Sequence, residues 1–232
     1  MRFGIVVFPG SNCDRDTFSA VERHGGEAVF LWHKDTSLQN ADCIILPGGF
    51  AYGDYLRTGA IARFSPIMSS VVKYAESGGK VIGICNGFQV LLEAGLLPGA
   101  MLVNKTLKFL GQDVFIKVEK NDLPFTSKYE LGDILRVPVA HFEGNYYVPD
   151  DILDELESEG RVVFRYCTKN GEVNDEGNPN GALRNIAGIC NKNRNVLGMM
   201  PHPERASDKV IHKTDGTKIW LSLLASLEGA AR

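Results

Sequence analysis

The chain has 232 residues, of which 44% are hydrophobic and 23% are charged, and it carries a net charge of -3. This balance is typical of a globular protein with one sizeable core, and it argues against non-specific binding to nucleic acid or to a membrane surface. We find no apolar run long enough to span a membrane and no signal peptide before the first predicted strand. We therefore expect a single domain over residues 1–232, in the cytoplasm, with no nucleic-acid or membrane partner.

The cysteines are odd in number and form no CxxC pair: Cys13, Cys43, Cys85, Cys167 and Cys190. Such scattered cysteines indicate a reducing compartment, and they predict neither a disulfide framework nor a zinc site. We accordingly expect no metal site in this chain.

In the first part of the chain, apolar strands alternate with helices. The predicted strands are residues 2–8, 27–32, 41–46 and 80–85, and the predicted helices are residues 14–24, 64–77 and 86–94. Asn12 or Asp14 can cap the first helix. This alternation indicates βαβ units, which build a parallel sheet with helices on both faces.

After residue 99 the pattern changes to strands with little helix between them. The predicted strands are residues 114–118, 134–139, 162–166, 185–191 and 195–200, and the last two flank a hairpin signal, KNRN. Residues 150–159 form one acidic helix, and residues 215–229 form a closing amphipathic helix. This part most simply extends the same sheet with antiparallel strands.

A candidate nucleophile lies where the strand of residues 80–85 meets the following helix. Cys85 stands at this junction, with Gly83 before it and Gly87 after it. Small neighbours allow the sharp strand-to-helix turn of a nucleophile elbow. The helix start also favours a thiolate and, later, an oxyanion. The alternative is a buried structural cysteine.

A cysteine nucleophile needs a base, and the base needs an orienting group. Three histidines are most simply surface residues: His24, His33 and His212. His202 lies in the stiff segment PHPE after an apolar strand, where Glu204 can reach the far nitrogen of its ring. The carboxyl ends of strands are where open α/β sheets place their sites. A rigid loop with a salt-bridged histidine is the alternative.

The segment LPGGF at residues 46–50 ends a strand at the same sheet edge. Consecutive glycines let the backbone turn an N–H group toward the site, where it and the N–H of Asn86 would form an oxyanion hole. An ordinary glycine-rich turn is the alternative. The segment lacks the lysine and the spacing of a phosphate loop.

Together these motifs resemble those of class I glutamine amidotransferases: GICNGFQ is similar to their G-x-C-x-G-x-Q, HPE to their H-x-E, and PGG to their oxyanion loop. The closer similarity is to the family of glutaminase subunits of phosphoribosylformylglycinamidine synthase. It extends over FGIVVFPGSNCDRD, PGGFAYGDYLRTGAIA, GICNGFQVLLEAGLLPGA, AHFEGNYY, NPNGALRNIAGI and GMMPHPER. Ala182 departs from the serine expected after NPNG.

The resemblance implies a flavodoxin-like α/β fold: a three-layer, open, mostly parallel sheet with an antiparallel extension. It also implies a glutaminase reaction. Cys85 would attack the side-chain amide of L-glutamine, and His202, oriented by Glu204, would move the protons. Water would then resolve a γ-glutamyl thioester to release glutamate.

The resemblance assigns further residues to the site. Gly49 or Phe50, with Asn86, would hold the oxyanion. Gln89 would help to hold the substrate glutamine, although it could instead bond locally within its helix. The segment from His141 to Gly144 would line the pocket.

The ammonia produced must reach a synthetase, and this chain has no ATP-binding signature. The implied partner is the large formylglycinamide ribonucleotide amidotransferase subunit, which carries ATP and Mg²⁺, together with a small third subunit. This chain itself would need no cofactor. We expect the segment YGDYLRT at residues 52–58 to meet the partner or to guide ammonia.

Three alternatives remain open at this point. The chain could be another cysteine hydrolase on the same layout, such as a γ-glutamyl hydrolase or a protease-like relative. It could be the glutaminase of a different amidotransferase, or a catalytically silent subunit kept for assembly.

Overall fold

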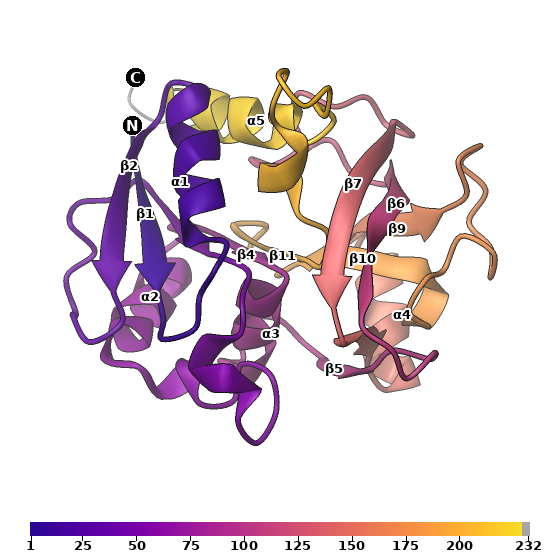
Figure 1. The fold of residues 1–232 in the computed structure, drawn as a ribbon, viewed down its shortest axis with the longest axis horizontal. Coiled ribbons are helices and arrows are strands. Elements are labelled where there is room, and N and C mark those ends of the chain that lie inside the picture. Colours follow the sequence, from indigo (N-terminus) through magenta and orange to yellow (C-terminus); the bar gives the residue numbers. More distant parts are fainter. Residues whose placement is uncertain (229–232) are drawn as a thin grey trace.

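A nine-stranded sheet runs through the computed structural model, which describes residues 1–228 (Figure 1). Its strand order is β2-β1-β3-β4-β11-β10-β9-β6-β7. The first five strands pair in parallel: β2 (Glu27–Trp32), β1 (Arg2–Val7), β3 (Cys43–Leu46), β4 (Lys80–Ile84) and β11 (Val196–Met199). This is the flavodoxin-like order, so the predicted fold class is confirmed.

Helices cover both faces of the parallel strands (Figure 1). One side carries α1 (Asp14–Arg23) and α5 (Thr217–Glu228), which both contact the short 3-10 helix η4 (Pro203–Ala206). The other side carries α2 (Pro66–Glu76) and α3 (Asn86–Glu93). Because both faces are covered, β3 is buried at every residue, which explains its unbroken apolar sequence.

The antiparallel extension predicted for the second half is confirmed. It comprises β10 (Ile186–Cys190), β9 (Val162–Cys167), β6 (Leu110–Val118) and β7 (Ile134–His141). The hairpin around KNRN joins β10 to β11 as expected. However, β11 also pairs in parallel with β4, so the hairpin inserts its second strand beside the strand that leads to Cys85. The acidic helix is α4 (Asp150–Ser158).

Several local expectations differ from the structure. Cys13, rather than Asn12 or Asp14, occupies the N-cap of α1, and its side chain makes no capping hydrogen bond. His33 is buried, not on the surface, and its Nδ1 forms a hydrogen bond with the hydroxyl of Tyr52, 2.7 Å away.

The pair of strands β5 (Ala100–Val103) and β8 (Glu143–Tyr147) was not predicted, since β5 is largely exposed and lacks a core pattern. The closing helix begins at Thr217 instead of residue 215, and residue 229 lies outside the described part. Within residues 1–228, no helix combines the length and the apolar character that crossing a membrane requires.

Candidate active site

Cys85 occupies a strained turn between β4 and α3. Its backbone has φ 50° and ψ −109°, in the positive-φ range that residues with a side chain rarely adopt. The turn leaves no space around it: a Cβ on Gly87 would lie 1.9 Å from the carbonyl oxygen of Leu46, and one on Gly83 would lie 2.6 Å from that of Gly87. The two glycines therefore permit the close approach of strand and helix that holds the thiol at the helix start.

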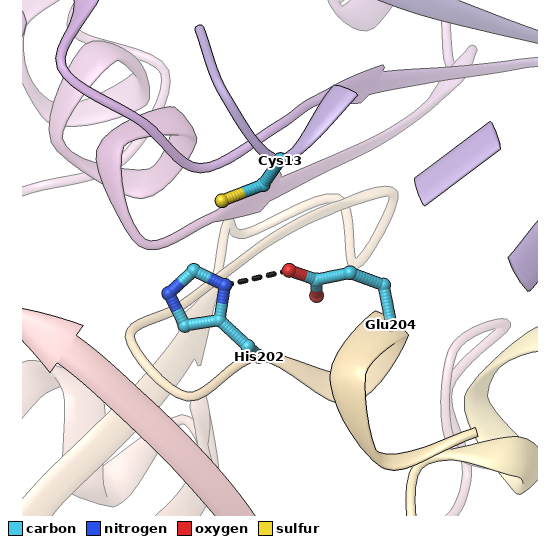
Figure 2. Close-up of side chains that lie close together, drawn as sticks. All are labelled: Cys13, His202 and Glu204. Atoms are coloured by element: carbon cyan, nitrogen blue, oxygen red, sulfur yellow. Dashed lines mark hydrogen bonds and ion pairs between the residues drawn. The ribbon is translucent and has the colours of Figure 1, made fainter. Parts of the chain in front are cut away.

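His202 and Glu204 form a buried pair immediately after β11. Nδ1 of His202 donates to Oε1 of Glu204 at 2.6 Å, and both side chains are at most 1% exposed (Figure 2). The backbone N–H of His202 is held by the carbonyl of Pro138 in β7. Because β11 is next to β4 in the sheet, the pair and Cys85 end at the same edge, as the sequence predicts.

The surroundings of His202 favour its protonated form. Burial acts against the charge, but the Glu204 carboxylate, followed by the thiols of Cys85 and Cys13, holds the pKa of His202 well above its ordinary value. Nε2 has no well-aligned hydrogen-bond partner among residues 1–228, so the neutral ring can take up the proton of Cys85 there and, once protonated, can pass it to a reacting group. The ring can therefore exchange a proton on one side while Glu204 orients it from the other.

Cys13 is a second thiol beside this pair, and no sequence motif predicts its position. Donor atoms of Cys13, His202 and Glu204 all lie within 4.8 Å of one another (Figure 2). Burial raises the pKa of the Cys13 thiol, and Nη2 of Arg205 lies 3.1 Å from its Sγ. Cys13 follows β1 in the chain, whereas His202 follows β11, so only the sheet order brings them together.

The backbone N–H groups predicted to form the oxyanion hole lie beside Cys85, but they differ in whether they already have a hydrogen-bond acceptor. Gly49 has φ 144°, and neither its N–H nor that of Asn86 has an acceptor within residues 1–228. The N–H of Phe50 instead donates to the carbonyl of Gly10 at 3.0 Å. The side chain of Asn86 braces the loop by accepting the N–H of Ala51 at 3.1 Å. Gly49 and Asn86 thus have free donors, while Phe50 would first have to leave Gly10.

A cavity of about 140 Å³ opens next to Cys85. Its lining residues are Gly49, Phe50, Asp54, Thr58, Cys85, Gln89, Ala140, His141, Phe142 and Glu143. Gln89 is fixed in place because its Nε2 donates to the carbonyl of Glu143 at 2.6 Å and its Oε1 accepts from Asn86 at 2.9 Å. Gln89 and His141 thus reach the pocket. Gly144 packs directly against the His141 ring: a Cβ added to this glycine would lie 2.2 Å from the ring.

His141 is buried in an uncharged state. Burial and the neighbouring His202 lower the pKa of His141 to about 4. Its Nδ1 lies 3.1 Å from Oδ1 of Asn104, which also accepts the N–H of Gly144. His141 therefore shapes the wall of the pocket and is not suited to act as a base near neutral pH.

Two carboxylates face the cavity, and among residues 1–228 no lysine or arginine lines it. Burial, with the negative charge of Glu143, raises the pKa of Asp54 to about 6. Glu143 is anchored by the hydroxyl of Thr58, which donates to it at 2.9 Å. A pair of acids without a protein cation suits a ligand that carries an ammonium group. Glu143 lies in the segment from His141 to Gly144 that was predicted to line the pocket, and Asp54 lies in the motif YGDYLRT, which was expected to meet the partner or guide ammonia; neither was predicted to act as an acid of the pocket.

Comparisons with known proteins show the family of the chain. The family model of the CobB/CobQ-like glutamine amidotransferase domain matches residues 1–226. A relative from Koribacter versatilis, named phosphoribosylformylglycinamidine synthase subunit PurQ, is 55% identical over 228 residues, covering 98% of this chain and 99% of its own. A relative of the same name from Moorella thermoacetica is 54% identical, covering 97% of this chain and 95% of its own.

A solved structure supports the same family. It is described as the structure of PurLQS from Thermotoga maritima, has a TM-score of 0.86 and 45% identity, and covers 97% of this chain and 98% of that one. The resemblance carried by the sequence motifs is thereby confirmed. The chain belongs to the glutamine amidotransferase family, among the relatives named phosphoribosylformylglycinamidine synthase subunit PurQ.

Proposed function

We propose that this chain is the glutaminase subunit of a phosphoribosylformylglycinamidine synthase and hydrolyses L-glutamine to glutamate and ammonia. The observation that carries the proposal is the strained Cys85 at the start of α3, next to the buried His202–Glu204 pair and open to a small acidic cavity. The relatives' names support the product of the larger reaction, phosphoribosylformylglycinamidine. Its formation from formylglycinamide ribonucleotide in purine synthesis is what the family resemblance implies.

In the first half-reaction, Cys85 gives its proton to Nε2 of His202 and its sulfur attacks the amide carbon of glutamine. Glu204 holds the ring so that this nitrogen faces the reacting atoms and stabilises the imidazolium that forms. The oxygen of the tetrahedral intermediate accepts hydrogen bonds from the free N–H groups of Gly49 and Asn86. Phe50 would join them only after release from Gly10.

In the second half-reaction, the imidazolium of His202 gives its proton to the leaving nitrogen, and ammonia departs. The γ-glutamyl group remains on Cys85 as a thioester. Water, deprotonated by the now neutral His202, attacks this thioester, and glutamate and the free thiol are restored. The same ring nitrogen serves as base and acid in turn, which is why its lack of a fixed partner suits the reaction.

The acid pair explains how an amino acid would be oriented in the cavity. The α-ammonium of glutamine lies toward Asp54 and Glu143, which places the side-chain amide at Cys85. Gln89 fixes the carbonyl of Glu143 and so keeps this wall in place. The role of these groups is binding, not chemistry.

The ammonia is consumed by a partner chain. A synthetase subunit carries the ATP and Mg²⁺ chemistry and receives ammonia through a channel, and a small third subunit joins the complex; no cofactor is assigned to this chain. The name PurLQS of the Thermotoga maritima structure supports such an assembly. A cytoplasmic location suits the free thiols of the five cysteines.

The test is glutamate release by this chain reconstituted with its synthetase, ATP and formylglycinamide ribonucleotide. We expect Cys85→Ser to abolish glutamate release and glutamine-dependent synthesis, while ammonium still supports synthesis. Undiminished glutamate release by Cys85→Ser would refute the assignment. A wild-type chain that assembles but never releases glutamate would instead identify a silent assembly subunit.

A further inference from the structure

Cys13 is not needed for the proposed glutaminase reaction, yet it lies in contact distance of the base and its orienting carboxylate. The three donor atoms lie within 4.8 Å of one another, and all three residues are buried (Figure 2). A thiolate sulfur, an imidazole nitrogen and a carboxylate oxygen form a typical zinc donor set, and three protein ligands leave a fourth position open. This group could not be recognised from the sequence, because Cys13 is far from His202 and Glu204 along the chain.

An unpartnered buried atom of Glu204 provides a second indication of a ligand. Oε2 of Glu204 has no hydrogen-bond partner within residues 1–228, whereas the unpartnered Nε2 of His202 is the atom that exchanges protons with Cys85. As a whole residue Glu204 is 4% exposed, so water does not readily replace the missing partner. A buried polar atom without a partner is costly, and a metal ion bound to this carboxylate would remove part of this cost.

The charges nearby are compatible with a divalent cation. Binding would convert the Cys13 thiol to a thiolate and release its proton, as metal binding to a thiol does. The thiolate and Glu204 would then balance the two charges of the ion. Arg205 opposes binding, since its Nη2 lies 3.1 Å from Sγ, but its Nε is already paired with Asp16 at 3.0 Å. A small withdrawal of this guanidinium toward Asp16 would free the sulfur.

We propose that Cys13, His202 and Glu204 form a zinc site whose occupation reversibly inhibits the glutaminase. A metal on the imidazole competes with its contact to Glu204 and prevents the ring from exchanging protons with Cys85. Metal binding depends only on the geometry of the three ligands. The inhibition rests on the proposed glutaminase function.

Binding is tested first in the Cys85→Ser protein, which retains all three ligands but lacks the other nearby thiol. Titration with Co²⁺ should give one bound ion and a sulfur-to-cobalt charge-transfer band, and zinc should displace it. The double variant Cys13→Ala/Cys85→Ser should lose the band. If Cys85→Ser shows no such band, or if the double variant keeps it, the proposed site is wrong. This titration needs no glutaminase activity, so it stands apart from the test of function.

Inhibition is tested in the reconstituted complex. Zinc should inhibit glutamate release, and a chelator should restore it. In Cys13→Ala the half-inhibitory zinc concentration should rise at least about tenfold, since the loss of one of three ligands should cost at least about 1.4 kcal/mol. Cys43→Ala is the matched control, because Cys43 is equally buried but pairs with Lys80 at the far end of its strand from the site.

The thermal unfolding midpoint of each variant checks that it folds, and Cys13→Ser replaces Cys13→Ala if the alanine variant does not. Zinc that inhibits the Cys13 variant and the wild type at the same concentration would place the metal on Cys85 and His202 alone. That result would overturn the proposal.

Discussion

Glu204 gives His202 its orientation and its charge through a hydrogen bond of 2.6 Å. Glu204→Gln keeps the size of the side chain but removes the carboxylate that raises the pKa of His202. We expect glutamate release to fall by roughly ten- to a thousandfold, as with other members of catalytic triads, without unfolding. Steady-state kinetics and thermal melting measure this. Glu130→Gln is the control, because Glu130 is exposed. Full activity of Glu204→Gln would show that Glu204 is only a loop residue without a role in the reaction.

The acid pair predicts a pH dependence of glutamine binding. The pKa of Asp54 is raised to about 6, so Asp54 is charged above that pH and loses its charge as the pH falls through it. The KM for glutamine should therefore increase below about pH 6, and Asp54→Asn should have a raised KM that lacks this step. The measurement is KM and kcat from pH 5 to pH 8.

A substrate analogue tests the same contact. The analogue 4-carbamoylbutanoate lacks the α-amino group. The KM for this analogue should therefore differ between Asp54→Asn and the wild type much less than the KM for glutamine does. Glu93→Gln is the matched control, because Arg57 pairs with that carboxylate at 2.7 Å outside the cavity. Equal losses for glutamine and for the analogue would show that Asp54 does not contact the ammonium group.

The elbow is the element that positions the nucleophile, and its glycines make it testable. A Cβ on Gly87 would meet the backbone of Leu46, which cannot move aside as a flexible side chain would. Gly87→Ala should lower the free energy of unfolding by roughly 1–3 kcal/mol and displace Cys85, with a loss of activity. Gly111→Ala is the control, because its Cβ would meet nothing closer than 3.6 Å. Denaturant unfolding measures the free energy of unfolding of both variants. A Gly87→Ala protein with unchanged stability and activity would contradict the close packing of Gly87 against Leu46.

Elements with strong local signals were predictable from the sequence. The nucleophile elbow and HPE each lie within a few consecutive residues, and parallel βαβ order brings the ends of their strands to one edge. Cys13 and Asp54 were not predictable as site residues, nor was the pairing of Asp54 with Glu143, because these depend on which loops meet across that edge. The parallel pairing of β11 with β4 was missed for the same reason: a hairpin signal predicts only its own two strands.

At the scale of the whole molecule, the oxyanion loop suggests control by the partner. The Phe50 N–H is occupied by Gly10, so the isolated chain holds this donor away from the substrate. Docking of the loaded synthetase would favour the conformer in which the loop is released, as a ligand that binds one state must. Glutamate release should then be slow for the lone chain and rise at least roughly tenfold in the complex, a coupling of about 1.4 kcal/mol or more. A lone chain that matches the complex would exclude this control.

The central claim is that Cys85, and not its neighbour Cys13, is the nucleophile. Both thiols lie near His202, so the ring alone does not distinguish them. Cys85 lines the cavity, whereas Cys13 does not. The most direct measurement is peptide mapping after reaction with a glutamine-analogue alkylating agent, with excess glutamine as the protecting control. We expect one label per chain, on Cys85, and we expect glutamine to prevent it. A glutamine-protected label on Cys13 would contradict this expectation.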